Sequence, residues 1–143
     1  MEFIKFWATA NRVAAKSGAS LEDEGAEAFV RTLFDQFKNH EGRLTAERWL
    51  AQSLENSFVS MDEPPKWVGE PFWPFCDGAP MLFFHQFTMS TSATHMQFPL
   101  GDTLYVFGAK KPRADGSFSV AYRIVAVDEE GCRSIPRSGD IVF

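Results

Sequence analysis

The chain has 143 residues, enough for one domain that buries roughly two-thirds of the surface exposed by its unfolded form. Its 45% apolar and 23% charged content is ordinary for a globular protein, but 15 phenylalanines are unusual. A net charge of −5 without a long basic run disfavours nucleic-acid binding. We predict no membrane span, no signal peptide and two reduced thiols, Cys76 and Cys132, and therefore expect a cytoplasmic protein.

The first 61 residues predict three helices. The first ends near Gly18, and the second follows Ser20 and Asp23, whose spacing is a helix-start signal. Gly42 closes the second helix, and Thr45 is placed to cap the third. The apolar stripes that define these helices are Phe3, Phe6, Trp7, Ala10, Val13 and Ala14, then Ala26, Val30, Leu33, Phe34 and Phe37, and then Leu50, Leu54, Phe58 and Met61 with Trp49 beside them.

The last part of the chain predicts an antiparallel sheet. Strands are expected over 81–87, 103–109 and 118–127, with a short last strand over 141–143. Both faces of 81–87 are apolar, which favours a central position in the sheet. Asp115-Gly116 is a strong hairpin signal. Along 118–127, one face carries Phe118, Val120, Tyr122, Ile124 and Ala126.

These elements predict an α+β fold in which three N-terminal helices pack on a small, mostly antiparallel sheet. We expect a single domain, 1–143. It divides into a helical layer over 1–61, a loop rich in proline and aromatic residues over 62–80, and the sheet over 81–143.

The segment from Pro64 to Phe87 combines prolines with bulky rings, and two interpretations stay open. Proline keeps this backbone extended, so that the rings can lie across the sheet. They then form a lid on the core, or one or two of them line a cleft for a peptide, a partner or a small ligand. The candidate binding residues are Trp67, Phe72, Trp73 and Phe75. Trp73 is the first choice because its indole N–H offers a polar contact.

This segment and its continuation resemble the core motif of the YwqG-like family, a domain of unknown function. The matching residues are Trp73-Pro74, Gly78, Pro80, Phe83 to Gln86, Pro99, Gly101, Leu104, Tyr105 and Phe107. The match spans about residues 69–111 and leaves out the N-terminal helices. The family has no secure activity, so the resemblance implies no catalytic residue.

Residues 34–50 match a calcium-binding EF-hand only in part. With Gly42 at loop position 6, Leu44 fits position 8, but Phe37 and Arg48 occupy positions that need carboxylates. Glu47 serves as the last ligand only if the loop loses a residue. The segment therefore predicts an ordinary αα-hairpin, and the spacing of histidines and cysteines predicts neither a metal site nor another cofactor.

A nucleophilic site is conceivable, with Cys76 as the nucleophile, His85 or His95 as the base, and Asp77 or Asp102 orienting the base. A free cysteine in a phenylalanine-rich loop is more often a small buried apolar residue. The chain has no G-x-S-x-G, H-E-x-x-H or phosphate-binding glycine motif. The sequence therefore predicts a non-catalytic protein-binding module of the immunity or regulatory type. The alternative is a small enzyme or ligand-binding domain with a Cys/His/Asp cleft.

Overall fold

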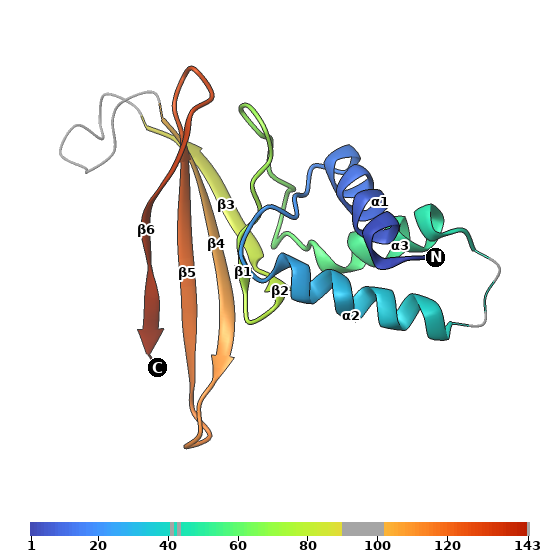
Figure 1. Ribbon diagram of the computed structural model, residues 1–143. Helices are drawn as coiled ribbons and strands as arrows, with labels where there is room; N and C mark the ends of the chain where they lie inside the picture. The colour runs from blue at the N-terminus through green and yellow to red at the C-terminus, as the bar shows by residue number, and fades with distance from the viewer. Residues whose placement is uncertain (41, 43, 90–101, 143) are drawn as a thin grey trace. The chain divides into compact units, whose positions relative to one another are not determined.

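The computed structural model describes residues 1–40, 42, 44–89 and 102–142. The predicted α+β class is confirmed, because three helices precede a mostly antiparallel sheet (Figure 1). The chain forms two compact units. The helical unit comprises Met1–Val59 and Pro71–Met81, and the sheet unit comprises Ser60–Glu70 and Leu82–Phe143. The predicted loop over 62–80 is thus divided between both units. None of the described helices is long and apolar enough to cross a membrane.

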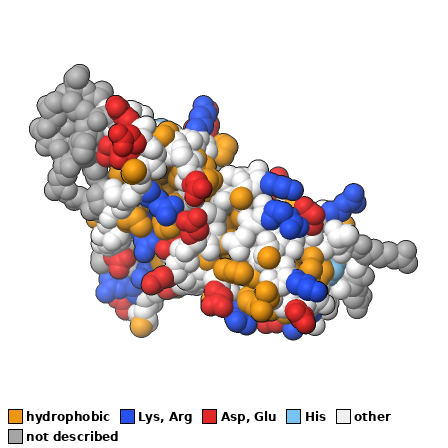
Figure 2. Space-filling view, turned by 45° about the horizontal axis from the view of Figure 1, so that its top comes forward, with side chains coloured by type: hydrophobic (Ala, Val, Ile, Leu, Met, Phe, Trp, Pro, Cys, Tyr) orange, Lys and Arg blue, Asp and Glu red, His pale blue; other side chains and the backbone are white. Residues whose placement is uncertain are grey.

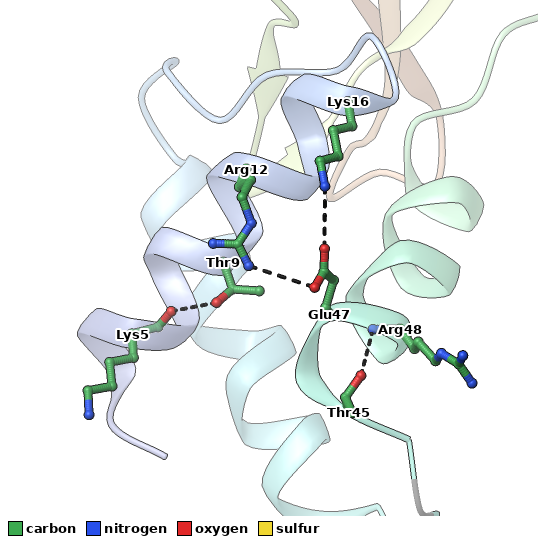
Figure 3. Close-up of polar contacts among 7 residues, drawn as sticks. All are labelled: Lys5, Thr9, Arg12, Lys16, Thr45, Glu47 and Arg48. Carbon is green, nitrogen blue, oxygen red and sulfur yellow. Dashed lines mark hydrogen bonds and ion pairs between the residues drawn. The ribbon is translucent and has the colours of Figure 1, made fainter.

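The three helices are α1 (Phe3–Lys16), α2 (Ala26–Asn39) and α3 (Ala46–Ser57), and all lie where the apolar spacing predicts them. The predicted cap of α3 is confirmed, because the backbone N–H of Arg48 donates to Oγ1 of Thr45 at 3.3 Å (Figure 3). The assignment of Met61 to this helix is wrong: its side chain is 68% exposed. Helix α3 has already ended because the backbone becomes extended at Phe58.

Aromatic side chains dominate the packing of the helical unit. Phe6 of α1 is fully buried, and its ring centroid lies 5.1 Å from that of Phe34, 5.5 Å from Phe37 and 6.3 Å from Trp49. Such tilted and stacked ring pairs add to the free energy gained from buried area. These rings therefore join α1 to the other two helices.

The start of α2 differs from the prediction. Gly25, with φ of 85°, precedes the helix, and no side chain caps it. Ser20 and Asp23 instead bind the segment Pro71–Met81. Oγ of Ser20 accepts the backbone N–H of Trp73 at 2.8 Å, and Oδ2 of Asp23 accepts that of Phe75 at 2.7 Å. Local spacing suited a cap, but these oxygens satisfy buried donors about 50 residues away.

The sheet unit contains strands β3 (Leu82–Thr88), β4 (Thr103–Pro112), β5 (Phe118–Val127) and β6 (Arg133–Val142). They lie in the order β3-β4-β5-β6, and each neighbouring pair is antiparallel. The predicted hairpin turn joins β4 to β5. Gly116 has φ of 86° there, and Oδ1 of Asp115 accepts the backbone N–H of Ser117 at 3.0 Å.

Two strand predictions are wrong. Strand β3 is an edge strand, not a central one, and its outer side is partly covered by a bridge from Ser60 and a 2.8 Å hydrogen bond from Met61 N–H to Phe83 C=O. The last strand runs over Arg133–Val142, not over 141–143. Its serines, arginines, proline and glycine conceal it in the sequence, because pairing with β5 depends on the backbone and not on side-chain type.

Candidate functional site

The first half of the proline- and aromatic-rich segment belongs to the sheet unit, where we call Ser60–Glu70 the strap. Polar side chains of the sheet fasten it. The Gln86 amide accepts the Lys66 N–H at 2.7 Å and donates to the Lys66 C=O at 2.9 Å. The fully buried Tyr105 hydroxyl accepts the Val68 N–H at 2.8 Å and donates to the same Lys66 carbonyl at 3.1 Å. Side chains of the sheet therefore make hydrogen bonds with the strap backbone that the backbone of a further strand would otherwise make.

Trp67 places an aromatic ring of the strap against this part of the sheet. Its ring centroid lies 4.5 Å from that of Tyr105 and 6.3 Å from that of Phe107. At the end of the strap, Gly69 approaches Gly131 so closely that an added Cβ would lie 3.2 Å from its carbonyl oxygen. Trp67 remains half-buried.

The second half of the segment, Pro71–Met81, belongs to the helical unit. It includes a short hairpin of β1 (Phe75–Cys76) and β2 (Ala79–Pro80). Trp73 is 3% exposed, its indole N–H donates to the Met81 carbonyl at 2.7 Å, and its ring meets Phe58 edge-on at 5.2 Å. Phe72 and Phe75 are also buried. These three side chains therefore contribute to the core of their unit, and the proposed polar contact of Trp73 is made internally.

The candidate catalytic residues lie on separate elements. Cys76 is half-buried on β1 of the helical unit, beside exposed Asp77 in the hairpin turn. His85 is exposed on β3, and Asp102 is buried immediately before β4. His95 lies outside the described residues.

Within the sheet unit, His85 and Asp102 line different hollows. The hollow beside His85 has a volume of about 370 Å³ and is also lined by Asp62, Glu63 and Lys66. The hollow beside Asp102 has a volume of about 570 Å³ and is also lined by residues 128–130 and 132–134. Burial raises the pKa of Asp102, and the charges of Asp128 and Glu129 raise it further. Among the described residues, no group of three His, Cys, Asp or Glu side chains is arranged to hold a metal ion.

Glu47 was considered above as the last ligand of a shortened calcium-binding loop. It lies on α3 and faces α1 (Figure 3). Its carboxylate is 3.5 Å from Nζ of Lys16 and 3.9 Å from the guanidinium of Arg12. All three side chains are more than half exposed, so these ion pairs contribute little to stability. They link two helices and leave this carboxylate beside cations.

The two faces of the four-stranded sheet differ in burial. Directly opposed residues of antiparallel strands share a face, so the register assigns each side chain. On the buried face, Phe83, Tyr105, Phe107, Val125 and Val127 are at most 2% exposed. On the other face, which we call the open face, Val106, Val120, Tyr122 and Ile124 are half-buried, Phe118 is 36% exposed and Ile141 is 51% exposed. One end of this face is closed, because Leu104 and Ala126 are buried in a cluster with Met89.

Rings on the open face lie over glycines of neighbouring strands. A Cβ added to Gly108 would lie 2.4 Å from the Phe84 ring, and one added to Gly139 would lie 3.2 Å from Tyr122. Phe84 is the extra residue at an irregularity between Phe83 and His85. These close approaches fix flat aromatic groups on a surface that remains accessible.

Sequence reasoning found the alternation along β5 but not which side is exposed. The face with Ser119, Ala121 and Arg123 is the more polar in sequence, yet Ser119 and Ala121 are buried. Phe84 and Ile141 were not singled out as surface residues. Gly108, within a predicted strand, is a sequence signal of a close approach at that position, but the ring that approaches it, that of Phe84, is known only from the structure.

A second apolar surface lies on the helical unit. Ile4 is 76% exposed, while Phe3 and Phe34 are half-buried. Arg31 lies over the Phe3 ring at 4.2 Å and Lys38 over that of Phe34 at 4.7 Å. Each cation also has a carboxylate partner on α2, so these charges are matched within the unit. Figure 2 shows hydrophobic side chains at the surface in patches among Lys, Arg, Asp and Glu.

No family model matches the chain, and neither the curated proteins nor the solved structures contain a significant match. The resemblance to the YwqG-like family stays a prediction.

Proposed function

We propose that the chain is a non-catalytic protein-binding module, of the regulatory or immunity type, and that its open sheet face is the binding surface. The observation that carries this proposal is the apolar character of that face. An antiparallel sheet with one buried face normally carries polar side chains on the other. Here the second face presents Val120, Tyr122 and Ile124 at its centre and Phe118 and Ile141 at its border.

Covering the accessible part of this face would gain free energy that favours binding. Completing the burial of a half-buried valine, isoleucine or tyrosine gains about 1 kcal/mol, because full burial of a large apolar side chain gains about 1.5–3 kcal/mol. Several such side chains lie side by side on β4, β5 and β6. The aromatic rings over Gly108 and Gly139 are already held in place, which lowers the entropy lost on binding.

The edges of the sheet are less suited to binding. The strap bridges β3 at Ser60 and Met61. The outer strand β6 contains Pro136, which has no backbone N–H to donate, and an irregularity between its pairing to Ile124 and to Ala126. A partner that adds a strand would meet these obstacles, whereas a partner that covers the face would not.

Site-specific photocrosslinking in cells tests the proposal. A photoreactive amino acid at Ile141 projects from the open face, and the matched control at Ser138 lies on the same strand, is also exposed and belongs to the other face. We expect a crosslinked protein product from position 141 and not from position 138. Absence of a protein crosslink from position 141, or equal products from both positions, would refute the proposal.

A further inference from the structure

We infer that the acidic hollow beside Asp102 binds a guanidinium group, carried by a small molecule or by an arginine side chain of a partner. This inference does not rest on the proposed function. The described residues that line the hollow include none of the accessible residues named for the open face. Three features of the sheet unit support it: the way in which the strands build the hollow, the surroundings of Asp102, and the size and charge of the hollow.

The strand register brings the acidic residues of the hollow together. Thr103 at the start of β4 pairs with Val127 at the end of β5, so Asp102 lies beside the turn that joins β5 to β6. Asp128 begins this turn. Its Oδ1 accepts two backbone N–H groups of the turn, at 2.9 Å and 2.8 Å. The Asp128 carboxylate is thus held in place by its own turn, next to Asp102.

Asp102 is a buried acidic residue without a partner. It is 9% exposed and lines the hollow. In the part of the chain that the structure describes, its carboxylate accepts no hydrogen bond and forms no ion pair. Burial raises its pKa, and so do the charges of Asp128 and Glu129. A cation in the hollow would provide the hydrogen bonds and the opposite charge that this carboxylate lacks.

The size and charge of the hollow indicate an organic cation. Its volume of about 570 Å³ is within the range of about 300–1,000 Å³ that is typical of small-molecule sites. Of the described residues that line it, four are acidic and only Arg133 is basic. No three of these acidic groups, however, are arranged to hold a metal ion. The hollow therefore favours a cation that is larger than a metal ion and has several donors.

Among organic cations, a guanidinium group fits this arrangement best. It is planar and carries five N–H donors, so it can bind oxygens of two carboxylates at once. It is also more weakly hydrated than an ammonium group, so it loses less free energy when it leaves water to contact buried Asp102. An ammonium group holds its charge and its three donors at a single atom and would reach fewer of these oxygens.

An NMR titration of the full-length chain at low ionic strength tests the inference. The probes are N-acetylarginine methylamide, the corresponding lysine derivative, and propylguanidine, which has the arginine side chain without the backbone. We expect both guanidinium compounds to shift the backbone amide signals of residues 128–134, with a Kd of about 1 mM or lower. The lysine derivative should bind at least about fivefold more weakly.

Two variants locate the site. Asp102→Asn should raise the Kd of the guanidinium compounds at least about tenfold, because it removes the charge that they contact. It should not lower Tm, since it removes a buried charge, so weaker binding would not reflect unfolding. Asp62→Asn removes the same charge from the other hollow of the sheet unit and should change the Kd less than about twofold.

Tighter binding of the arginine derivative than of propylguanidine assigns the group to a protein side chain, and the reverse order assigns it to a small molecule. Both results support the site. The inference would be overturned if these amide signals did not shift with up to about 20 mM of either guanidinium compound. Equal weakening by both substitutions, or equal binding of the lysine derivative, would overturn it as well.

Discussion

Removing one hydroxyl group tests how the strap is held on the sheet. In Tyr105→Phe, the Val68 N–H loses its 2.8 Å acceptor, and the Lys66 carbonyl keeps only the Gln86 amide as donor. A lost hydrogen bond costs about 0.5–1.5 kcal/mol, and an unsatisfied buried donor costs up to about 3 kcal/mol. Tyr105 is buried but its partners Val68 and Lys66 on the strap are exposed, so we expect a loss of about 1–2 kcal/mol, or about 3–6 °C in Tm.

Urea denaturation measures this loss, and hydrogen exchange at the Val68 amide locates it. Tyr122→Phe is the matched control, because Tyr122 is a half-buried tyrosine on the open face. Its loss should stay below about 0.5 kcal/mol. The reasoning fails if both variants lose the same stability, or if exchange at Val68 is not faster in Tyr105→Phe than in the wild type.

Three further predictions concern other parts of the structure. Ser20→Ala leaves the buried N–H of Trp73 without its acceptor and should cost about 1–3 kcal/mol in urea denaturation; an unchanged midpoint would contradict that hydrogen bond. Gly108→Ala places a methyl group against the Phe84 ring and should cost about 1–3 kcal/mol, which the double variant with Phe84→Ala should partly restore. Asp102→Asn should raise Tm at pH 7, because the raised pKa means that folding disfavours this carboxylate. The gain should disappear as the pH falls below 3.8, where wild-type Asp102 is itself protonated, and a gain that persists there would refute its electrostatic origin.

The helices were predictable because their signals are local. Apolar residues three and four positions apart define one face of each helix, and Thr45 caps α3 through a residue only three positions away. Ser20 and Asp23 show the limit of this reasoning. Their spacing is that of a cap, but their oxygens bind backbone groups of Trp73 and Phe75, and no local pattern reveals that competition.

The sheet was predictable where the hairpin is short and incompletely predictable elsewhere. Asp115-Gly116 fixes the pairing of β4 with β5, whose bounds agree closely with the expected strands. Strand β3 has two apolar faces for a reason other than a central position: Phe83 belongs to the buried face, while Phe84 lies on the open face. The sequence shows that both faces of this strand are apolar, but it does not show that β3 has a neighbouring strand of the sheet on one side only.

The candidate surface depended on information that the sequence does not contain. For the rings of the segment Pro64 to Phe87, the sequence left two interpretations open, a lid on the core or the lining of a cleft. In the structure, Phe72, Trp73 and Phe75 are buried, while Tyr122 and Ile141 lie on the open face. Burial depends on contacts between distant strands, whereas local sequence specifies only the alternation of side chains.

The division of the chain has a practical consequence. The backbone passes from one unit to the other after Val59, after Glu70 and after Met81, so each unit is assembled from two separate stretches. A fragment that stops at Val59 would lack Trp73 and Phe75, and one that starts at Leu82 would lack the residues that pair with Gln86 and Tyr105. No single cut therefore releases either half intact. Fragment complementation, with the two pieces produced together, is the appropriate way to study the halves.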